Sequence, residues 1–348
     1  MTKKMKRTFV LGAGASAFAG YPLGLDLWRF LNDPDEPELN TKAARDAVSE
    51  MMKPILLLYP PKQQDRPDLE QLFTLLDLGH LGAGPVELRR DNWPVDKKKI
   101  TRLIAENFQW HEVKFQAQIV HARRSFGLEI DRGFGRSVLA GWVDHLKPGD
   151  TIVSFNWDLL HEAALWRVGK WHFADGYGFR CRDASENVQS PIKVLKLHGS
   201  VNWSQESETS EVAEIEHKKD FFDGAVDDPQ VYEPPRRSGW NMGRNLIVPT
   251  YMKDLSANRL LLRLWKQART ALSESDEIIV IGYSLNAADA GARELFATAL
   301  DQRQPAPRLL IISPDQIQWD RFCHHLGIER IRVRKKFEDW ITTNPLSL

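Results

Sequence analysis

Asn156 and His198 carry side chains suited to acid–base chemistry, and each directly follows a short apolar run. Histidine is the side chain most easily poised as a general base near neutral pH. The amide of an asparagine orients a water molecule or a sugar hydroxyl. The two residues lie far apart in the sequence, so only the fold can bring them together. A lone histidine at the end of a strand is more often a hydrogen-bonded structural residue, and the residues alone leave this alternative open.

A glycine-rich loop, Gly12-Ala13-Gly14-Ala15-Ser16, follows the first apolar run of the chain. Glycine lets backbone N–H groups approach a pyrophosphate, and the start of a following helix favours its negative charge. A single Gly-x-Gly is a weak signal, because tight turns also use glycine. Two later apolar runs also end in such loops, Gly282-Tyr283-Ser284-Leu285 and Ser313-Pro314-Asp315. Together the loops favour a nucleotide site with Ser313 or Asp315 at a ribose, although Asp315 fits a helix N-cap equally well.

Short apolar runs alternate with helical patterns, which predicts an α/β fold with a parallel, doubly wound sheet. Ligands of such sheets bind outside the carboxyl ends of the strands, where the candidate residues lie. The expected strands are Lys6–Leu11, Thr151–Phe155, Lys193–Leu197, Asn245–Val248, Glu277–Ile281, Arg308–Ile312 and an edge strand Arg330–Val333. The expected helices among them are Asp158–Val168, Ala257–Ser273 and Ala287–Leu300.

Residues 25–146 have a different pattern, with helical spacing of apolar residues and no convincing strand. The expected helices in this range are Ala43–Leu58, Leu69–Leu78, Ile100–Arg123 and Ser137–Leu146. We therefore expect a helical insertion over 25–146 in a sheet domain made of 1–24 and 147–348. Residues 205–240 hold ten Asp or Glu against four Lys or Arg. They predict a solvated acidic loop within the sheet domain, or alternatively a lid or partner-contact surface.

The bulk composition excludes several classes of function. Lys and Arg together number 47, as do Asp and Glu, so no net charge attracts nucleic acid or an anionic membrane. Two cysteines cannot form a four-cysteine zinc site or a disulfide framework. The basic and apolar start resembles a signal peptide, but glycines at 12, 14 and 20 interrupt the apolar run. We expect a cytoplasmic protein that binds no metal.

Several motifs in this order resemble the sirtuin-like NAD hydrolases of bacterial antiphage defence. They are Gly12-Ala-Gly-Ala-Ser16, Ser-Phe-Asn156-Trp-Asp158, Lys-Leu-His198-Gly-Ser200, Leu246-Ile-Val-Pro249 with Lys253, and Gly282-Tyr-Ser-Leu285 with Asp289. The set is fairly specific in this order, whereas no single member is. The resemblance covers both ends of the sheet domain but not 25–146 or 205–240.

The resemblance implies a sirtuin-like Rossmann domain that binds NAD as its substrate. It implies that Asn156 and His198 form the catalytic pair, with Asp158 as a third member or a supporting residue. The residues that it places on the phosphate and ribose loops are Gly12, Ala13, Gly14, Ala15, Ser16, Gly199, Gly282, Ser284, Leu285, Ser313 and Asp315.

Two departures from protein-deacylating sirtuins bear on the activity. Those enzymes usually carry a four-cysteine zinc module, and this chain cannot supply one. Their Gly-Ile-Pro-Asp-Phe-Arg after the first loop is Gly20-Tyr-Pro-Leu-Gly-Leu-Asp26 here. The helical insertion and the missing zinc module favour hydrolysis over deacylation, so we expect cleavage of NAD to nicotinamide and ADP-ribose in abortive infection. The alternatives are an NAD-dependent deacylase or ADP-ribosyltransferase, and a non-catalytic sensor of NAD or ADP-ribose.

An unregulated NAD hydrolase would kill its host, so we expect control by assembly. The expected assemblies are a homo-oligomer or a complex with a protein such as a HerA-like ATPase or a short Argonaute. The helical insertion or the acidic segment would carry the contact. We expect no direct contact with nucleic acid and none with a membrane.

Overall fold

The computed structural model describes residues 5–21, 23, 69–83, 92, 97, 101, 134–181, 188–204, 214–215, 258–286, 289–301, 305–326 and 330–343. The expected strand Asn245–Val248, the expected helix Ala43–Leu58 and almost all of Ile100–Arg123 lie outside these residues. So does the expected acidic loop 205–240, apart from residues 214 and 215.

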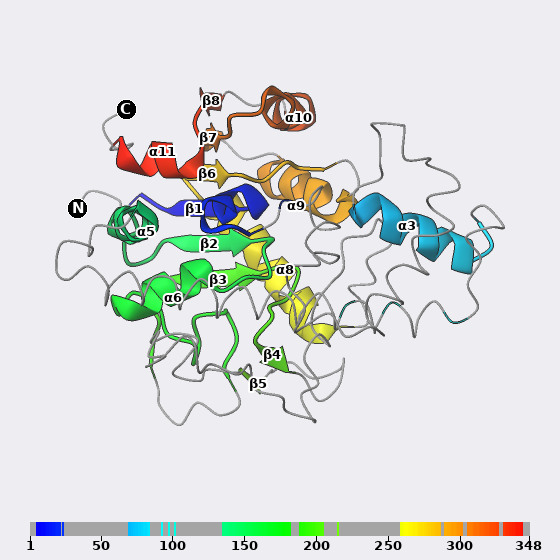
Figure 1. Ribbon diagram of the computed structural model, residues 1–348, viewed down its shortest axis with the longest axis horizontal. Coiled ribbons are helices and arrows are strands. Elements are labelled where there is room, and N and C mark those ends of the chain that lie inside the picture. The colour runs from blue at the N-terminus through cyan, green and yellow to red at the C-terminus, as the bar shows by residue number, and fades with distance from the viewer. Residues whose placement is uncertain are drawn as a thin grey trace.

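A six-stranded parallel sheet forms the centre of the described fold (Figure 1). Its strands are β1 (Arg7–Leu11), β2 (Thr151–Ser154), β3 (Lys193–Lys196), β6 (Glu277–Ile281), β7 (Arg308–Ile312) and β8 (Arg330–Val333). They follow the order β3-β2-β1-β6-β7-β8, and every neighbouring pair is parallel. From β1 the chain first adds β2 and β3 on one side and then β6, β7 and β8 on the other, as in Rossmann-like folds. The direction in which strands are added therefore reverses between β1 and β6. The predicted parallel α/β sheet and the edge position of β8 are thus confirmed.

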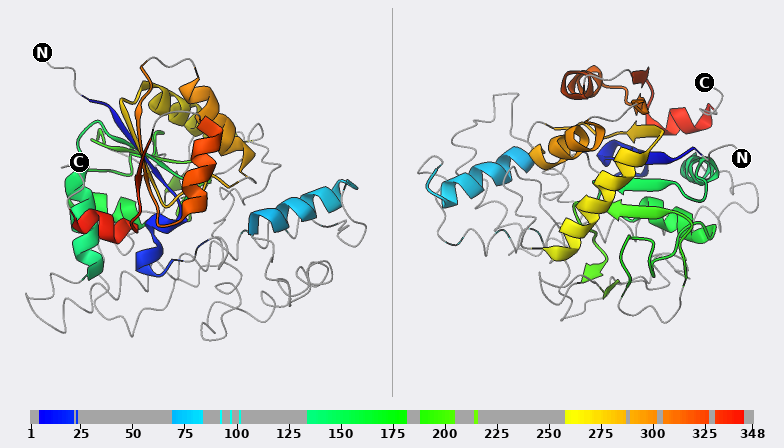
Figure 2. Two further views of the ribbon diagram at one scale, coloured as in Figure 1. Left: turned by 90° about the horizontal axis from the view of Figure 1, so that it is seen from above. Right: turned by 180° about the vertical axis from the view of Figure 1, so that it is seen from behind.

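Helices cover both faces of the sheet (Figure 2). On one face lie α5 (Phe134–His145), α6 (Leu160–Arg167) and α11 (Phe337–Thr342). On the other lie α8 (Arg259–Glu274), α9 (Ala290–Leu300) and α10 (Gln316–Leu326). The sequence patterns did not predict α10 and α11. A further helix, α3 (Leu69–His80), matches the expected Leu69–Leu78 and lies beyond the carboxyl ends of the strands in Figure 1.

The central strand β1 is buried along its whole length, because each face packs against a helix layer. On one face Phe9 meets Trp142 of α5 edge to face, with ring centroids 5.2 Å apart. On the other face Thr8 Oγ1 accepts a hydrogen bond from Ser275 Oγ at 2.6 Å, directly after α8. The last part of the expected insertion 25–146 forms α5. Because α5 packs on β1, this part belongs to the helix layer that covers the sheet.

A buried ion pair fixes the amino end of the sheet. Arg7 at the start of β1 donates from Nε to Asp150 Oδ1 at 3.1 Å, just before β2, and from Nη2 to the carbonyl oxygen of His145. Two short antiparallel strands, β4 (Trp203–Ser204) and β5 (Glu214–Ile215), form a separate hairpin that the sequence did not predict. None of the helices within the described ranges has the length and apolar character needed to cross a membrane.

Candidate functional site

The expected site residues meet at the carboxyl edge of the sheet, because the strand ladder continues one residue past each strand. Gly12 N donates to Ile281 O at 3.1 Å, and Gly282 N donates to Ile312 O at 3.1 Å. In the same way, Phe155 N donates to Leu11 O, Leu197 N to Ser154 O, and Ser313 N to Val333 O, at 2.9, 2.9 and 3.1 Å. The loops that carry Asn156 and His198 therefore lie in one row with the two glycine loops, as the strand pattern predicted.

The glycines of the β1 and β6 loops allow these two loops to touch. A Cβ on Gly12 would lie 2.5 Å from Cα of Tyr283, and a Cβ on Gly14 would lie 2.8 Å from Cα of Gly282. Gly282 has a φ of +59°, and a Cβ there would lie 2.5 Å from the backbone N of Ala15. Both the left-handed backbone and the contact require glycine. Close packing at the reversal point of the sheet is thus sufficient to explain these three residues.

The amides of the first loop are largely engaged within the protein. Gly14 N donates to Gly282 O at 3.0 Å, Ala15 N to Gly12 O at 2.8 Å, and Ser16 N to Ala13 O at 3.1 Å. The described chain continues as two short 3₁₀ turns, Ala13–Ala15 and Ala17–Ala19. The loop is therefore foremost a joint between β1 and β6, because the N–H groups of Gly14, Ala15 and Ser16 donate to backbone carbonyls.

This joint fixes the side chain of Asn156. Its Nδ2 donates to Gly12 O at 3.0 Å and to Ser16 Oγ at 3.2 Å, and its backbone N donates to Ser154 Oγ at 3.2 Å. A carbonyl oxygen only accepts, so the contact with Gly12 decides which end of the amide is nitrogen. Asn156 is 7% exposed and Ser16 is fully buried. The orientation of the Asn156 carbonyl oxygen is thus set by the first loop.

His198 belongs to a second buried group, which we call the His198 cluster: His198, Asp289, Tyr283 and Phe155. The imidazole Nε2 lies 3.4 Å from Oδ2 of Asp289, and the hydroxyl of Tyr283 donates to the same oxygen at 2.9 Å. Phe155 stacks on Tyr283 with centroids 4.1 Å apart and meets the imidazole edge to face at 5.2 Å. A histidine, its carboxylate partner and two rings thus come from three different strand ends.

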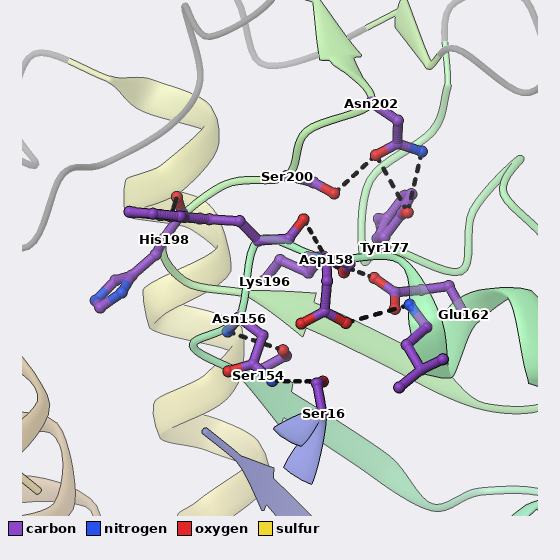
Figure 3. Close-up of polar contacts among 12 residues, drawn as sticks. Ser16, Ser154, Asn156, Asp158, Glu162, Tyr177, Lys196, His198, Ser200 and Asn202 are labelled. Atoms are coloured by element: carbon purple, nitrogen blue, oxygen red, sulfur yellow. Dashed lines mark hydrogen bonds and ion pairs between the residues drawn. The ribbon is translucent and has the colours of Figure 1, made fainter. Parts of the chain in front are cut away.

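The loop that carries His198 is fixed by hydrogen bonds from larger side chains. The indole of Trp157 donates to His198 O at 3.1 Å, and that of Trp265 on α8 donates to Leu197 O at 3.0 Å. Further along, Ser200 Oγ and Asn202 form hydrogen bonds in a network with Tyr177 (Figure 3). Burial raises the pKa of Tyr177 well above 10.0, so its hydroxyl stays protonated and the network stays intact near neutral pH.

Asp158 lies in a third group, which we call the Lys196 cluster: Lys196, Glu162, Asp158 and His161. The ammonium of Lys196 is fully buried and donates to the backbone oxygens of Trp157 and Asp158 and to Oε1 of Glu162. The carboxylate of Asp158 accepts from the N–H of Leu160 at 3.2 Å, at the start of α6. In Figure 3 the imidazole of His198 points away from this cluster. Of the two expectations for Asp158, its contacts fit the supporting residue, because its carboxylate holds the start of α6.

Burial dominates the electrostatics of the Lys196 cluster. It lowers the pKa of His161 from 6.5 to about 4, against the opposing effect of Asp158. It raises the pKa of Glu162, although the charge of Lys196 acts in the opposite direction. Neither shift involves a group that faces the His198 imidazole.

The remaining expected residues have local structural partners. Ser313 Oγ donates to Gln318 Oε1 at 2.7 Å, and exposed Asp315 accepts from the N–H of Ile317 at 2.9 Å in the first turn of α10. Of the two alternatives for Asp315, the structure has the helix cap. Leu285 has a φ of +44° and a buried side chain, and Ser284 O accepts from exposed Arg321. Gly199 follows His198 with a φ of +79°, which favours glycine.

Two residues occur in the motifs of the sequence, Asp289 and Lys196, but the sequence assigned neither a role in the site. The partner of His198 is Asp289, whose helix-capping position was readable but whose contact with a distant histidine was not. Lys196 left a clearer signal, because a lysine within a buried apolar strand requires an internal partner. Among the described ranges, no three His, Cys, Asp or Glu residues gather in a way that could hold a metal ion.

Neither models of known protein families nor curated proteins match this chain. The fold and the row of loops define a Rossmann-like α/β protein with a buried His–Asp pair at the carboxyl edge of its sheet.

Proposed function

We propose that the chain hydrolyses NAD to nicotinamide and ADP-ribose, with His198 and Asn156 at the reacting ribose. The observation that carries the proposal is the buried His198–Asp289 pair at the carboxyl edge, in the same row of loops as the fixed amide of Asn156. Dinucleotides bind Rossmann-like sheets at this edge, where the strand order reverses. The resemblance of the strand-end motifs to sirtuin-like NAD hydrolases supplies the choice of substrate.

His198 is the proposed general base. Its Nε2 faces the Asp289 carboxylate, so a proton on Nε2 leaves Nδ1 as the basic nitrogen of the ring. As water attacks C1′ of the ribose, the glycosidic electron pair passes to the pyridinium nitrogen and neutral nicotinamide leaves. The proton of the water passes to His198, and Asp289 stabilises the resulting imidazolium. The transition state is oxocarbenium-like, as in other glycoside cleavage.

Asn156 is the proposed positioning group for the nucleophile. Both hydrogen bonds from its Nδ2 go to the β1 loop, so its carbonyl oxygen is the atom left to accept from a water or a ribose hydroxyl. A nucleophile held in the reactive geometry lowers the barrier by several kcal/mol. Asp158 supports the loop that follows Asn156, because its carboxylate accepts from the N–H of Leu160 at 3.2 Å.

The test is chromatography of NAD incubated with the purified protein. We expect nicotinamide and ADP-ribose from the wild type, and at least a roughly 10²-fold loss of rate in His198→Ala and Asn156→Ala. The matched control is His324→Ala, an exposed histidine on α10, which should keep the full rate. Circular dichroism checks that each variant is folded. Full turnover by folded His198→Ala would exclude this assignment.

The products also separate the other activities. O-acyl-ADP-ribose formed with an acylated peptide would indicate a deacylase, and ADP-ribose attached to protein would indicate a transferase. Retention of NAD without turnover would indicate a sensor.

A further inference from the structure

We propose that Asp289 is a positioning residue that sets both the orientation and the basicity of His198, with Tyr283 holding the carboxylate in place. The catalytic part of this inference rests on the proposed hydrolysis of NAD, whereas the coupling of the two side chains does not.

The two oxygens of Asp289 have separate partners. Oδ1 accepts from the N–H of Ala292 at 3.1 Å and caps the first turn of α9. Oδ2 accepts from the Tyr283 hydroxyl at 2.9 Å and faces Nε2 of His198 at 3.4 Å. A cap requires one oxygen, which asparagine or serine supplies equally well. The second oxygen therefore assigns Asp289 a role beyond the helix.

The surroundings of Asp289 favour a negative charge beside the imidazole. Asp289 is 2% exposed and lies at the N-terminus of an 11-residue helix, and its carboxylate accepts hydrogen bonds from Tyr283 and Ala292. A buried carboxylate at this distance stabilises the imidazolium over the neutral ring. His198 thereby becomes a stronger base than a histidine with the same burial and no carboxylate.

Tyr283 connects the polar and the aromatic halves of the His198 cluster. Its hydroxyl holds Asp289, and its ring stacks on Phe155, which in turn lies against the imidazole. The segment from β6 to α9 thus places two titratable groups at His198, Asp289 and Tyr283. The end of β2 contributes the uncharged ring of Phe155, which also meets the ring of Trp265 on α8 edge to face.

The test compares Asp289→Asn with the wild type in the full chain. Asparagine keeps the cap and the shape but removes the charge. We expect the pKa of His198, followed by NMR of its ring, to fall by about 1 unit or more. With NAD we expect kcat to fall at least about tenfold with little change in KM, and its acidic limb to move to lower pH. Tyr283→Phe should shift both readouts in the same direction by less.

The controls separate this role from helix capping and from the proposed function. Asp289→Ser also keeps a capping oxygen and should reproduce the effects of Asp289→Asn, whereas Asp320→Asn on α10, which pairs with Gln316, should change neither readout. An unchanged His198 pKa in both Asp289 variants overturns the inference, whatever their activity. A lowered pKa in a protein that does not consume NAD supports the coupling and instead rejects the hydrolase.

Discussion

The Lys196 cluster and the His198 cluster are both buried and polar, yet their contacts differ in kind. Lys196 ends β3 and His198 follows two residues later, and in Figure 3 the imidazole of His198 points away from the ammonium of Lys196. The ammonium of Lys196 has three oxygen acceptors, two of them backbone carbonyls of the loop after β2. The Nε2 of His198 instead lies 3.4 Å from the Asp289 carboxylate, and the imidazole meets the ring of Phe155 edge to face.

This difference separates a group that holds the backbone from a group whose ring nitrogen faces a carboxylate. A buried ammonium that donates to two backbone carbonyls and one carboxylate fixes the loop that carries those carbonyls. An imidazole beside one carboxylate gains or loses a proton without breaking the loop. We infer that stability depends on the Lys196 cluster and chemistry on the His198 cluster.

The largest expected loss of stability comes from Lys196→Met, which disrupts the Lys196 cluster. The variant leaves the carboxyl of Glu162 buried without its cation and removes two hydrogen bonds to the loop backbone. Loss of one partner of a buried pair costs about 3–5 kcal/mol in the free energy of unfolding. Denaturant unfolding at neutral pH measures this cost.

The matched control is Lys193→Met at the other end of β3. Lys193 pairs with Asp175 at the surface, where its side chain is 38% exposed. Such pairs contribute about 1 kcal/mol or less. Equal losses for the two methionine variants would contradict the division between the clusters.

The next effect is a dependence of stability on pH that comes from His161. Burial lowers the pKa of its imidazole from 6.5 to about 4, so the folded protein keeps it neutral while the unfolded chain takes up a proton. The unfolded state therefore binds more protons between about pH 6.5 and 4, and stability falls as the pH falls through this window. The pKa difference corresponds to roughly 3 kcal/mol.

His161→Phe removes this contribution and keeps an aromatic ring between Trp142 and Phe337. Glu162 has a raised pKa and acts with the opposite sign, since its contribution falls as the pH rises, and it remains in both proteins. The difference in unfolding free energy between the two proteins, measured from pH 7 to 4, isolates His161. Parallel curves would show that burial of this ring is not what governs its titration.

The fold was predictable where local pattern determines it. Continuous apolar runs that end in polar or glycine residues located β1, β6 and β7 to within a residue. The patterns missed α11, which has six residues and is too short for a helical period, and α10, whose sequence is largely polar. The strand order depends on contacts between distant residues, which no local pattern encodes.

The site was predictable to the level of the strand ends but not of the partners. Asn156 and His198 were found because each ends an apolar run. The resemblance implied Asp158 as a third member or a supporting residue, yet the carboxylate that faces His198 belongs to Asp289, in the chain after β6. The pattern of Gly12 and Gly14 predicts a phosphate loop, while their contacts show a joint between the loops after β1 and β6. A glycine needed for packing and one needed for a ligand look alike in a sequence.

A smaller loss of stability is expected from Gly282→Ala, which tests the joint between the loops after β1 and β6, with Gly20→Ala as its control. Both glycines have a positive φ, but a Cβ on Gly282 meets the backbone of Ala15 at 2.5 Å whereas one on Gly20 meets nothing within 4 Å. The left-handed backbone costs about 1 kcal/mol at either position. The contact adds about 2 kcal/mol at Gly282. Unfolding free energies of the pair give the difference, and equal costs would mean that the two loops separate without penalty.

The smallest effect on stability is expected from His198→Gln, although it removes the proposed base. Glutamine has a similar volume, and its amide donates to Asp289 in place of the imidazole. We expect the free energy of unfolding to change by less than about 1.5 kcal/mol, whereas Lys196→Met should lower it by about 3–5 kcal/mol. A stable but inactive His198→Gln beside a destabilised Lys196→Met would support the division between the clusters. If His198→Gln unfolded as readily as Lys196→Met, the imidazole would be a structural residue, and the carboxylate at 3.4 Å would serve the loop and not a proton transfer.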